Sequence, residues 1–246
     1  MFGCDCGFSR NTYDPTANDN VNGTISNHNW KGYLQQFFSS GYFAHKVALI
    51  DLESDYQSLI GGHKGNFQRE AKKCERAGFF IKEINYRTYI TEVSEINRSK
   101  PIRCGRKMSP DYMKTVEQLG GQYTVKHPPE TPPCKFHRGI FYGCFSNEPG
   151  FWGDGKLVAY IGINLFGNFA NYSMIIGHGD YLKKGIMQFL HLQVLELLKA
   201  NGFSRYVIYY LYFSGEENLI SWKRRAGFRS YNLTFNKDER NNYPTK

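Results

Sequence analysis

The stretch Ile176-Gly177-His178-Gly179-Asp180-Tyr181-Leu182-Lys183-Lys184-Gly185-Ile186 joins a predicted strand to a predicted long helix, and it decides which fold we expect. Its three glycines allow the backbone to bend and to approach a ligand closely. The first amides of the following helix have no partner inside the helix, and they lie at the positive end of its dipole. Lys183 and Lys184 add two positive charges. The stretch therefore predicts a phosphate or pyrophosphate site, and an ordinary helix start with solvated lysines is the alternative.

Predicted strands and helices follow one another in a clear order in the C-terminal half of the chain. The apolar patterns predict strands over 137–145, 156–166 and 171–178, a helix over 185–200, a strand over 205–212, a helix over 217–226 and a strand over 228–235. Gly167-Asn168 suits a hairpin between the second and third strands. A hairpin followed by strand, helix, strand, helix and strand predicts an α+β fold (mixed α/β), with a central mixed sheet flanked by helices.

The N-terminal half is divided less clearly. Residues 1–41 are rich in Asn, Gly, Ser and Asp and predict an irregular N-terminal arm, so that the main domain spans 42–246. Within this domain the patterns predict a strand over 45–52, a helix over 66–77, a strand over 79–86 and helices over 91–97 and 109–120. Residues 127–134 hold four of the nine prolines and predict a stiff loop, at which the domain would divide if it has two halves.

Composition limits the classes of protein to which the chain can belong. It has 246 residues, a formal charge of +9 and 16% aromatic residues, which favours one large folded domain. No apolar run approaches the roughly 18 residues of a membrane span, and the first residues show no secretory signal. We therefore expect a cytoplasmic protein without a membrane partner. The six cysteines lack the spacing of a zinc site, so we expect reduced thiols and no metal.

Positive charge is concentrated in one part of the sequence. Residues 1–60 carry a net charge of −3, from 3 basic and 6 acidic residues, whereas residues 61–110 carry +7, from 12 basic and 5 acidic residues. Five of these basic residues lie close together in a loop that glycine and proline interrupt: Arg98, Lys100, Arg103, Arg106 and Lys107. Such a cluster is typical of contacts with nucleic-acid phosphates, and a solvated basic loop is the alternative.

A second motif lies one strand after the glycine-rich stretch. Residues 218–228, Asn-Leu-Ile-Ser-Trp-Lys-Arg-Arg-Ala-Gly-Phe, form a predicted short helix that ends in Gly-Phe. Over residues 156–235, the order of the elements and these two motifs resemble the Gcn5-related N-acetyltransferase (GNAT) superfamily. The resemblance implies a GNAT-like sheet, an acyl-CoA donor such as acetyl-CoA, and an amine acceptor. It also implies that the glycine-rich stretch binds the donor's pyrophosphate, through Gly177, Gly179, Lys183, Lys184, Gly185 and Ile186.

Three positions differ from the pattern of that superfamily. The loop usually begins with Arg or Gln and ends in Gly or Ala, where this chain has Leu182 and Met187. Many members carry Tyr four residues before the final glycine, where this chain has Lys223. The pair Trp222-Lys223 resembles the Fem-type aminoacyl transferases, which share a GNAT-like core and use aminoacyl-tRNA. That resemblance implies that Lys223 neutralises a phosphate of the donor, and that Trp222 and Arg224 belong to a nucleic-acid-binding surface.

Four residues are candidates for the chemistry. Acyl transfer requires a proton to leave the amine, and the leaving group often needs a proton. His178 titrates near neutral pH and is the candidate base, while Tyr210 and Tyr212, at the end of a predicted strand, are candidate proton donors. Lys223 is the fourth candidate, through its resemblance to the Fem-type lysine. Histidine and tyrosine are also common in protein cores, so structural roles stay open.

The sequence leaves three candidate functions. The sequence contains no Gly-x-Ser-x-Gly elbow, P-loop or His-Glu-x-x-His motif, which disfavours a serine hydrolase, a P-loop NTPase and a zinc enzyme. We expect a GNAT-like N-acyltransferase that moves an acyl group from an acyl-CoA-type thioester to an amine of a small molecule or macromolecule. The first alternative is an aminoacyl transferase that uses aminoacyl-tRNA or modifies nucleic acid bases. The second is a nucleic-acid-binding protein without catalysis.

Overall fold

Residues 46–54, 56, 65–103, 105–129, 137–166, 169–202, 204–213 and 217–231 are described by the structure, a computed structural model. The predicted N-terminal arm and most of the proline-rich loop lie outside these ranges. The arm and the domain boundary at the loop therefore stay predictions.

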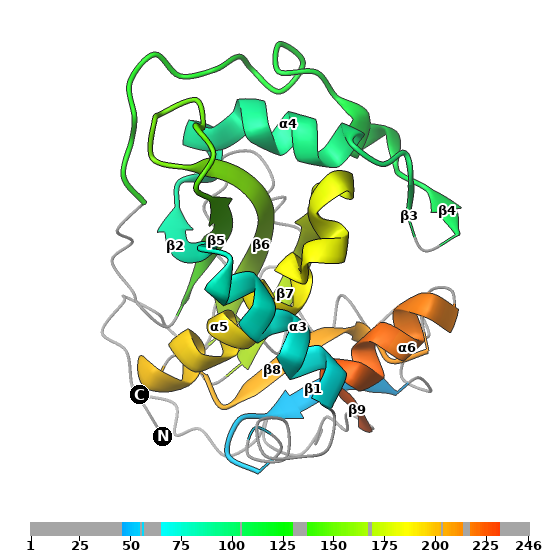
Figure 1. The fold of residues 1–246 in the computed structure, drawn as a ribbon. Helices are drawn as coiled ribbons and strands as arrows, with labels where there is room; N and C mark the ends of the chain where they lie inside the picture. The colour runs from blue at the N-terminus through cyan, green and yellow to red at the C-terminus, as the bar shows by residue number, and fades with distance from the viewer. Residues whose placement is uncertain are drawn as a thin grey trace, which may run out of the picture.

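Seven strands form one mixed sheet in the order β2-β5-β6-β7-β8-β1-β9 (Figure 1). In chain order they are β1 (Val47–Asp51), β2 (Phe80–Ile84), β5 (His137–Ser146), β6 (Lys156–Phe166), β7 (Phe169–Gly177), β8 (Tyr206–Leu211) and β9 (Arg229–Tyr231). Neighbouring strands are antiparallel except β7 and β8, which are parallel. A separate hairpin consists of β3 (Ile102–Arg103) and β4 (Arg106–Lys107).

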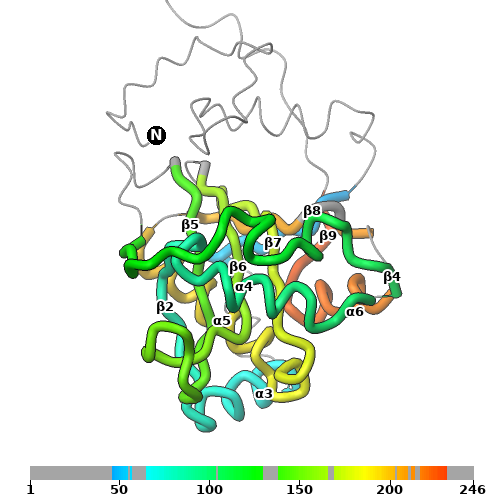
Figure 2. Tube along the Cα trace, turned by 90° about the horizontal axis from the view of Figure 1, so that it is seen from above, coloured from blue at the N-terminus to red at the C-terminus, as the bar shows by residue number. Residues whose placement is uncertain are grey.

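Helices cover both faces of the sheet. They are α3 (Gly65–Arg76), α4 (Ile90–Arg98), α5 (Ile186–Ala200) and α6 (Glu217–Arg225), with the 3-10 helices η3 (Tyr86–Tyr89), η4 (Pro110–Met113) and η5 (Gly179–Lys184). Successive residues of a strand point to opposite faces. In β5, Tyr142 and Cys144 pack in the core cluster that contains α3 and α5, whereas Phe145 packs in a second cluster with α4. Accordingly, α3 and α5 lie on one face and α4 lies on the other (Figures 1 and 2).

Apolar periodicity explains the two helices that pack together on one face. In α5 the buried residues recur every three or four positions, which places one face of the helix against β5, β6 and β7. α3 buries Phe67, Ala71 and Cys74 at a similar spacing and packs along α5. Gly78 follows α3 with a φ of +84°, a left-handed conformation that glycine adopts readily at helix ends.

The predicted α+β fold, a mixed sheet flanked by helices, is confirmed, and so is the hairpin of β6 and β7. The helix predicted over 109–120 is wrong. Only the short η4 forms there, because Lys114 is extended and its carbonyl oxygen accepts a hydrogen bond from Ser94 of α4 at 3.0 Å. Two further features were not expected from the sequence. The basic loop contains the β3–β4 hairpin, and β1 pairs between β8 and β9.

Within the described ranges, no helix is both long enough and apolar enough to cross a membrane. The same residues contain no group of three or more His, Cys, Asp or Glu side chains that is placed to hold a metal ion. Cys74 and Cys144 are buried free thiols, and the other four cysteines lie outside the described residues.

Candidate active site

The parallel strands β7 and β8 part from one another inside the sheet. Their pairing is limited to three residue pairs, Phe169–Tyr206, Ala170–Val207 and Asn171–Ile208. β7 nevertheless continues to Gly177, and beyond Asn171 its described partner is β6 alone. From Tyr172 to Gly177, one edge of β7 thus carries backbone groups without a ladder partner among the described strands. Such an edge can bind an extended ligand that carries amide groups.

A β-bulge lies just beyond the point where the strands part. Gly162 of β6 pairs with Met174, and Ile163 pairs with Tyr172, so Ser173 is an extra residue in β7. A bulge bends its strand and increases the local twist, and bulges are common next to active sites. The extra residue lies two positions beyond Asn171, which is the last residue of β7 that pairs with β8.

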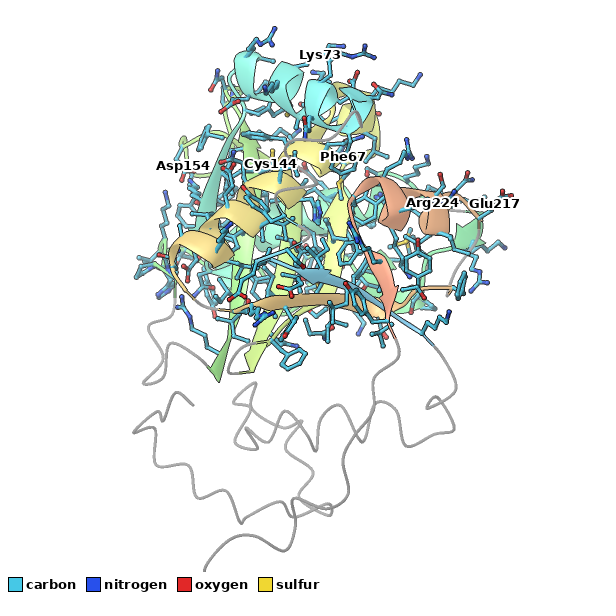
Figure 3. All side chains as sticks on the ribbon, turned by 90° about the horizontal axis from the view of Figure 1, so that it is seen from below. Phe67, Lys73, Cys144, Asp154, Glu217 and Arg224 are labelled. Atoms are coloured by element: carbon cyan, nitrogen blue, oxygen red, sulfur yellow. The ribbon has the colours of Figure 1, made fainter. Side chains whose placement is uncertain are left out.

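Where β7 and β8 part, aromatic side chains pack on the face of the sheet that α5 covers. Tyr172 and Tyr209 are the first residues beyond the last β7–β8 pair, and their ring centres are 6.0 Å apart. Trp222 of α6 packs against Tyr209 at 6.0 Å and against Phe67 of α3 at 6.4 Å. In Figure 3, Phe67 lies at the end of α3 that is nearer to α6. The predicted nucleic-acid contact Trp222 is therefore part of the aromatic packing.

Lys223 of α6 is fully buried against this aromatic cluster. Its Nζ lies 5.4 Å from the ring centre of Tyr209. Desolvation lowers the pKa of its amine to about 8. An amine with that pKa exchanges protons near neutral pH, as acid–base catalysts do. The contact with a phosphate of the donor, which the Fem-type resemblance implied for Lys223, stays a prediction.

His191 of α5 connects β7 with the end of α6. Its Nδ1 lies 3.3 Å from the hydroxyl of Tyr172, and its Nε2 lies 2.9 Å from the carbonyl oxygen of Ala226. Burial lowers its pKa to about 4, so the ring is neutral at pH 7. A tautomer that donates from Nε2 and accepts at Nδ1 satisfies both contacts. His191 was not predictable from the sequence, because it lies within an apolar helix without a motif around it.

The glycine-rich stretch folds as η5 followed by α5, with Gly185 between them. The amide of Gly179 donates to the hydroxyl of Ser99 at 2.8 Å, and the amide of Asp180 donates to Nδ1 of His178 at 3.3 Å. No side chain caps the first turn of α5. The amides that suit an anion are therefore those at the start of α5, whereas the Gly179 amide has an intramolecular partner.

Gly185 also has a packing role that its motif did not reveal. A Cβ at this position would lie 2.4 Å from the carbonyl oxygen of Glu70 in α3. The φ of +81° at Gly185 independently disfavours other residues. α3 therefore packs directly on the turn, and Gly185 is required for this contact whether or not a ligand binds.

The two predicted lysines of the stretch differ in their surroundings. Lys183 is exposed, as an anion contact requires. Lys184 places its Nζ 4.5 Å from the ring centre of Tyr181, so part of its interaction is with this aromatic ring. Gly177 and Ile186 are buried, and a Cβ at Gly177 would lie 2.5 Å from the sulfur of Met187.

His178 follows the last residue of β7. Its side chain is 15% exposed, and burial lowers its pKa below the ordinary value, while the nearby Asp180 opposes the shift. His178 lies six positions beyond Tyr172 along the strand, which corresponds to roughly 20 Å. His178 and Lys223 therefore lie at opposite ends of the open edge of β7, and they do not act on the same atom.

The predicted proton donors of β8 are described in part. Tyr212 is half-buried, and its amide donates to the carbonyl oxygen of Lys46 at 2.7 Å. The side chain of Tyr210 lies outside the described residues. The roles of both tyrosines stay predictions.

The basic residues predicted to bind nucleic acid fall into two groups. Arg103 is half-buried. The exposed ones are Arg98 at the end of α4, Lys100, Arg106 and Lys107 near the β3–β4 hairpin, and Arg224 on α6. The hairpin and α6 lie on the same side of the molecule (Figures 1 and 2). In Figure 3, Arg224 lies at the opposite end of the molecule from Asp154.

The fold has counterparts among solved structures, although no family model and no curated protein matches the sequence. They include the C-terminal domain of a protein described as a lysylphosphatidylglycerol synthetase from Agrobacterium fabrum (13% identity, TM-score 0.47), L-PGS from Bacillus licheniformis (16%, 0.47) and a tandem GNAT protein from the clavulanic acid biosynthesis pathway (15%, 0.43). GNAT proteins, which the motifs resemble, are thus among the similar structures.

These similarities cover 79%, 76% and 80% of this chain, respectively. The chain spans 63%, 57% and 55% of the three solved chains, which is less than two thirds of each. Likeness at this level transfers no donor or acceptor from those proteins to this one.

Proposed function

We propose that this chain is a transferase that moves an acyl group from an acyl-CoA-type thioester to an amine. The observation that carries the proposal is the open edge of β7, which runs from Tyr172 to Ile176 and leads through Gly177, whose carbonyl oxygen accepts a hydrogen bond from Arg103, towards the start of α5. The arm of such a donor is extended and contains amide groups, so it can pair with an open strand edge. A pyrophosphate at the other end of the arm suits the uncapped first turn of α5, with Lys183 beside it.

In this arrangement the two ends of the open edge of β7 contact different parts of the donor. With the phosphates at α5, the thioester lies near Ser173 and Tyr209, where the strands part. The acceptor amine attacks the thioester carbon, so that a C–N bond forms, the C–S bond breaks and the sulfur leaves as a thiolate. The attacking nitrogen loses a proton to solvent, and Lys223 donates a proton to the thiolate. A pKa of about 8 for Lys223 suits this transfer.

His178 has a different role under this proposal from the base predicted by the sequence. It lies at the phosphate end of the edge, roughly 20 Å along the strand from the point of parting. We assign to it contact with the anionic end of the donor, beside the start of α5. Hydrolysis or aminolysis at the thioester would then be insensitive to His178 once the donor is saturating.

An aminoacyl-tRNA donor is the second candidate. The exposed basic residues Lys100, Arg106, Lys107 and Arg224 lie on one side of the molecule, and such a distribution favours a polyanion. An amino acid ester would occupy the same end of β7 as the thioester. In this case the leaving group is a ribose hydroxyl, and Lys223 again supplies the proton.

Thermal unfolding of the full chain with separate ligands distinguishes these functions. We expect acetyl-CoA to raise the melting temperature, and Lys183→Ala to weaken this effect without changing the melting temperature of the free protein. A tRNA response that falls steeply with salt, and that the double variant Arg106→Gln/Lys107→Gln reduces, would favour the second candidate.

Product formation provides the chemical test. Released thiol is measured with acetyl-CoA and a panel of amines, in the wild type and in Lys223→Met. The proposal requires a signal in the wild type that Lys223→Met reduces. Binding of tRNA or duplex DNA without transfer from any donor would instead indicate a binding protein, and the absence of any acetyl-CoA effect would refute the acyl-CoA donor.

A further inference from the structure

Two side chains that follow α4 hold the end of β7. Arg103 of β3 donates from Nη1 to the carbonyl oxygen of Gly177 at 2.8 Å and from Nη2 to the carbonyl oxygen of Ile96 at 2.7 Å. The hydroxyl of Ser99 accepts from the amide of Gly179 at 2.8 Å and donates to the carbonyl oxygen of Ile96 at 2.6 Å. The last residue of β7 and the first residue of η5 are thereby both tied to the end of α4.

These contacts form one connected network. Nη2 of Arg103 lies 3.3 Å from the hydroxyl of Ser99, and a Cβ at Gly179 would lie 3.0 Å from the carbonyl oxygen of Ser99. The flat guanidinium group presents its donors at fixed angles, so it can bridge two carbonyl oxygens from different elements. Lysine has no such fork, and it would replace the charge of Arg103 without reproducing both bonds.

In the β3–β4 hairpin, Arg103 points towards β7, whereas its neighbour Ile102 points to solvent. Ile102 pairs with Lys107, and Arg103 pairs with Arg106, so these two pairs point to opposite faces of the hairpin. Ile102 is 53% exposed, and Lys107 is exposed as well. Arg103 therefore faces away from Lys107, and it differs from Arg106, which shares its face of the hairpin, in being half-buried rather than exposed.

We propose that Ser99 and Arg103 are positioning residues of the donor site, which fix the course of the chain from β7 into η5 and thus the orientation of the turn before α5. The proposal deepens the proposed function, because it assigns to these residues control over how the anionic end of the donor is received. The positioning itself is measurable without a donor.

The pKa of His178 responds to changes in this network. The charged groups that act on it come from every side: Asp180 from its own turn, Lys156 from β6, Glu95 from α4 and Arg103 from β3. Removing the charge of Arg103 raises the pKa of His178, because a nearby cation disfavours the protonated ring. Ser99→Ala changes no charge, and its expected effect is instead on the Gly179 amide, which loses its acceptor.

The test compares four full-length variants with the wild type: Arg103→Gln, Arg103→Lys, Ser99→Ala and Ser99→Thr. Arg205→Gln is the matched control, because Arg205 is a surface arginine paired with Asp51 and Glu53 at the start of β8. The measurements are the NMR titration of His178, assigned with His178→Gln, the exchange rate of the Gly179 amide, and the affinity for acetyl-CoA.

We expect Arg103→Gln to raise the pKa of His178, and Arg103→Lys to leave it near the wild-type value. Arg103→Lys and Ser99→Ala should both speed exchange of the Gly179 amide and weaken acetyl-CoA binding about tenfold, with a larger effect on KM than on kcat. Ser99→Thr keeps the hydroxyl and should restore binding. Arg205→Gln should match the wild type in every readout.

The two proposals fail in different ways. If the wild type binds no acetyl-CoA, the proposed donor is wrong, while the His178 titration and the Gly179 exchange still test the positioning. If the variants fold and both readouts equal those of the wild type, the positioning role is refuted. If Arg103→Gln does not fold, Arg103→Lys and Ser99→Ala decide the question by amide exchange and affinity.

Discussion

The two arms of the sheet differ in how firmly their strands are joined. On one side of β7, the ladder between β5 and β6 has ten residue pairs, and the ladder between β6 and β7 has eight. On the other side, β7 and β8 share three. A strand that pairs along only one edge is ordered by that ladder, and about half of its backbone N–H and C=O groups point away from the ladder. The long ladders therefore hold β7 along one edge, while beyond Asn171 its other edge has no partner among the described strands.

The largest expected effect concerns the turn that joins this edge to α5. Gly185→Ala should lower the free energy of unfolding by roughly 3 kcal/mol, because the new Cβ meets the backbone of Glu70 at 2.4 Å and the φ is +81°. Gly202, at the other end of α5, has a φ of +61° and open space around it. Gly202→Ala should cost about 1 kcal/mol, from the backbone alone.

Urea unfolding of the two variants measures this difference. Equal losses would mean that α3 does not press on the turn in solution. A Gly185 variant with a defective fold would also lose donor binding for structural reasons alone. Lys183→Ala is therefore the better variant for testing donor binding.

The second effect is a pH dependence at the junction of the two arms. His191 has a pKa of about 4 in the folded protein and 6.5 as the ordinary value. Between these pH values the unfolded chain binds the proton and the folded protein does not, so stability falls as the pH is lowered. From pH 7 to pH 5 the loss from this residue is about 2 kcal/mol. His191→Gln should be less stable at pH 7 but should lack this part of the pH dependence.

The measurement is urea unfolding of both proteins at pH 7 and pH 5. Parallel losses in the two proteins would show that His191 is not buried in its neutral form. The contacts of its ring with Tyr172 and Ala226 would then not be what holds the end of α6 against β7.

The third effect separates stability from function at the buried lysine. Lys223 has a pKa of about 8, below its ordinary value of 10.5, so the folded protein gains stability as the pH rises from 8 to 10.5. Lys223→Met keeps a similar length without a charge to bury. It should remove this gain in stability between pH 8 and pH 10.5, while acyl transfer falls. A variant that keeps the same pH dependence and is fully active would contradict both expectations.

Much of the sheet followed from local patterns. The strand Lys156–Phe166 and the helices α5 and α6 were predictable because apolar periodicity, glycine and turn residues all act within a few positions of the sequence. The helix expected after Ser109 failed because a capping serine and a proline define only a first turn. Whether a helix continues beyond Lys114 depended on a hydrogen bond from Ser94, which is distant in sequence.

The candidate site was predictable in its location and not in its contacts. The glycines of the stretch 177–185 indicated a sharp turn at the end of a strand, and the structure has one. Nothing local indicated that Ser99 would bond to the Gly179 amide, or that α3 would require Gly185. The bulge at Ser173 also left no sequence signal, because it arises from the register between two strands. Contacts of this kind depend on the tertiary arrangement, which a single sequence pattern does not contain.

The smallest expected effect is in the amide exchange of β7, and it tests the comparison of the two arms directly. Amides of β7 that face β6 belong to a long ladder, whereas those that face β8 lose their partners after Asn171. We therefore expect alternate amides from Tyr172 to Gly177 to exchange faster than the amides of β6. Excess acetyl-CoA should slow these same amides by on the order of tenfold and leave Phe169 to Asn171 unchanged. Uniformly slow exchange along β7 would mean that its edge is covered in solution, and the contrast between the two arms would then have no bearing on a donor.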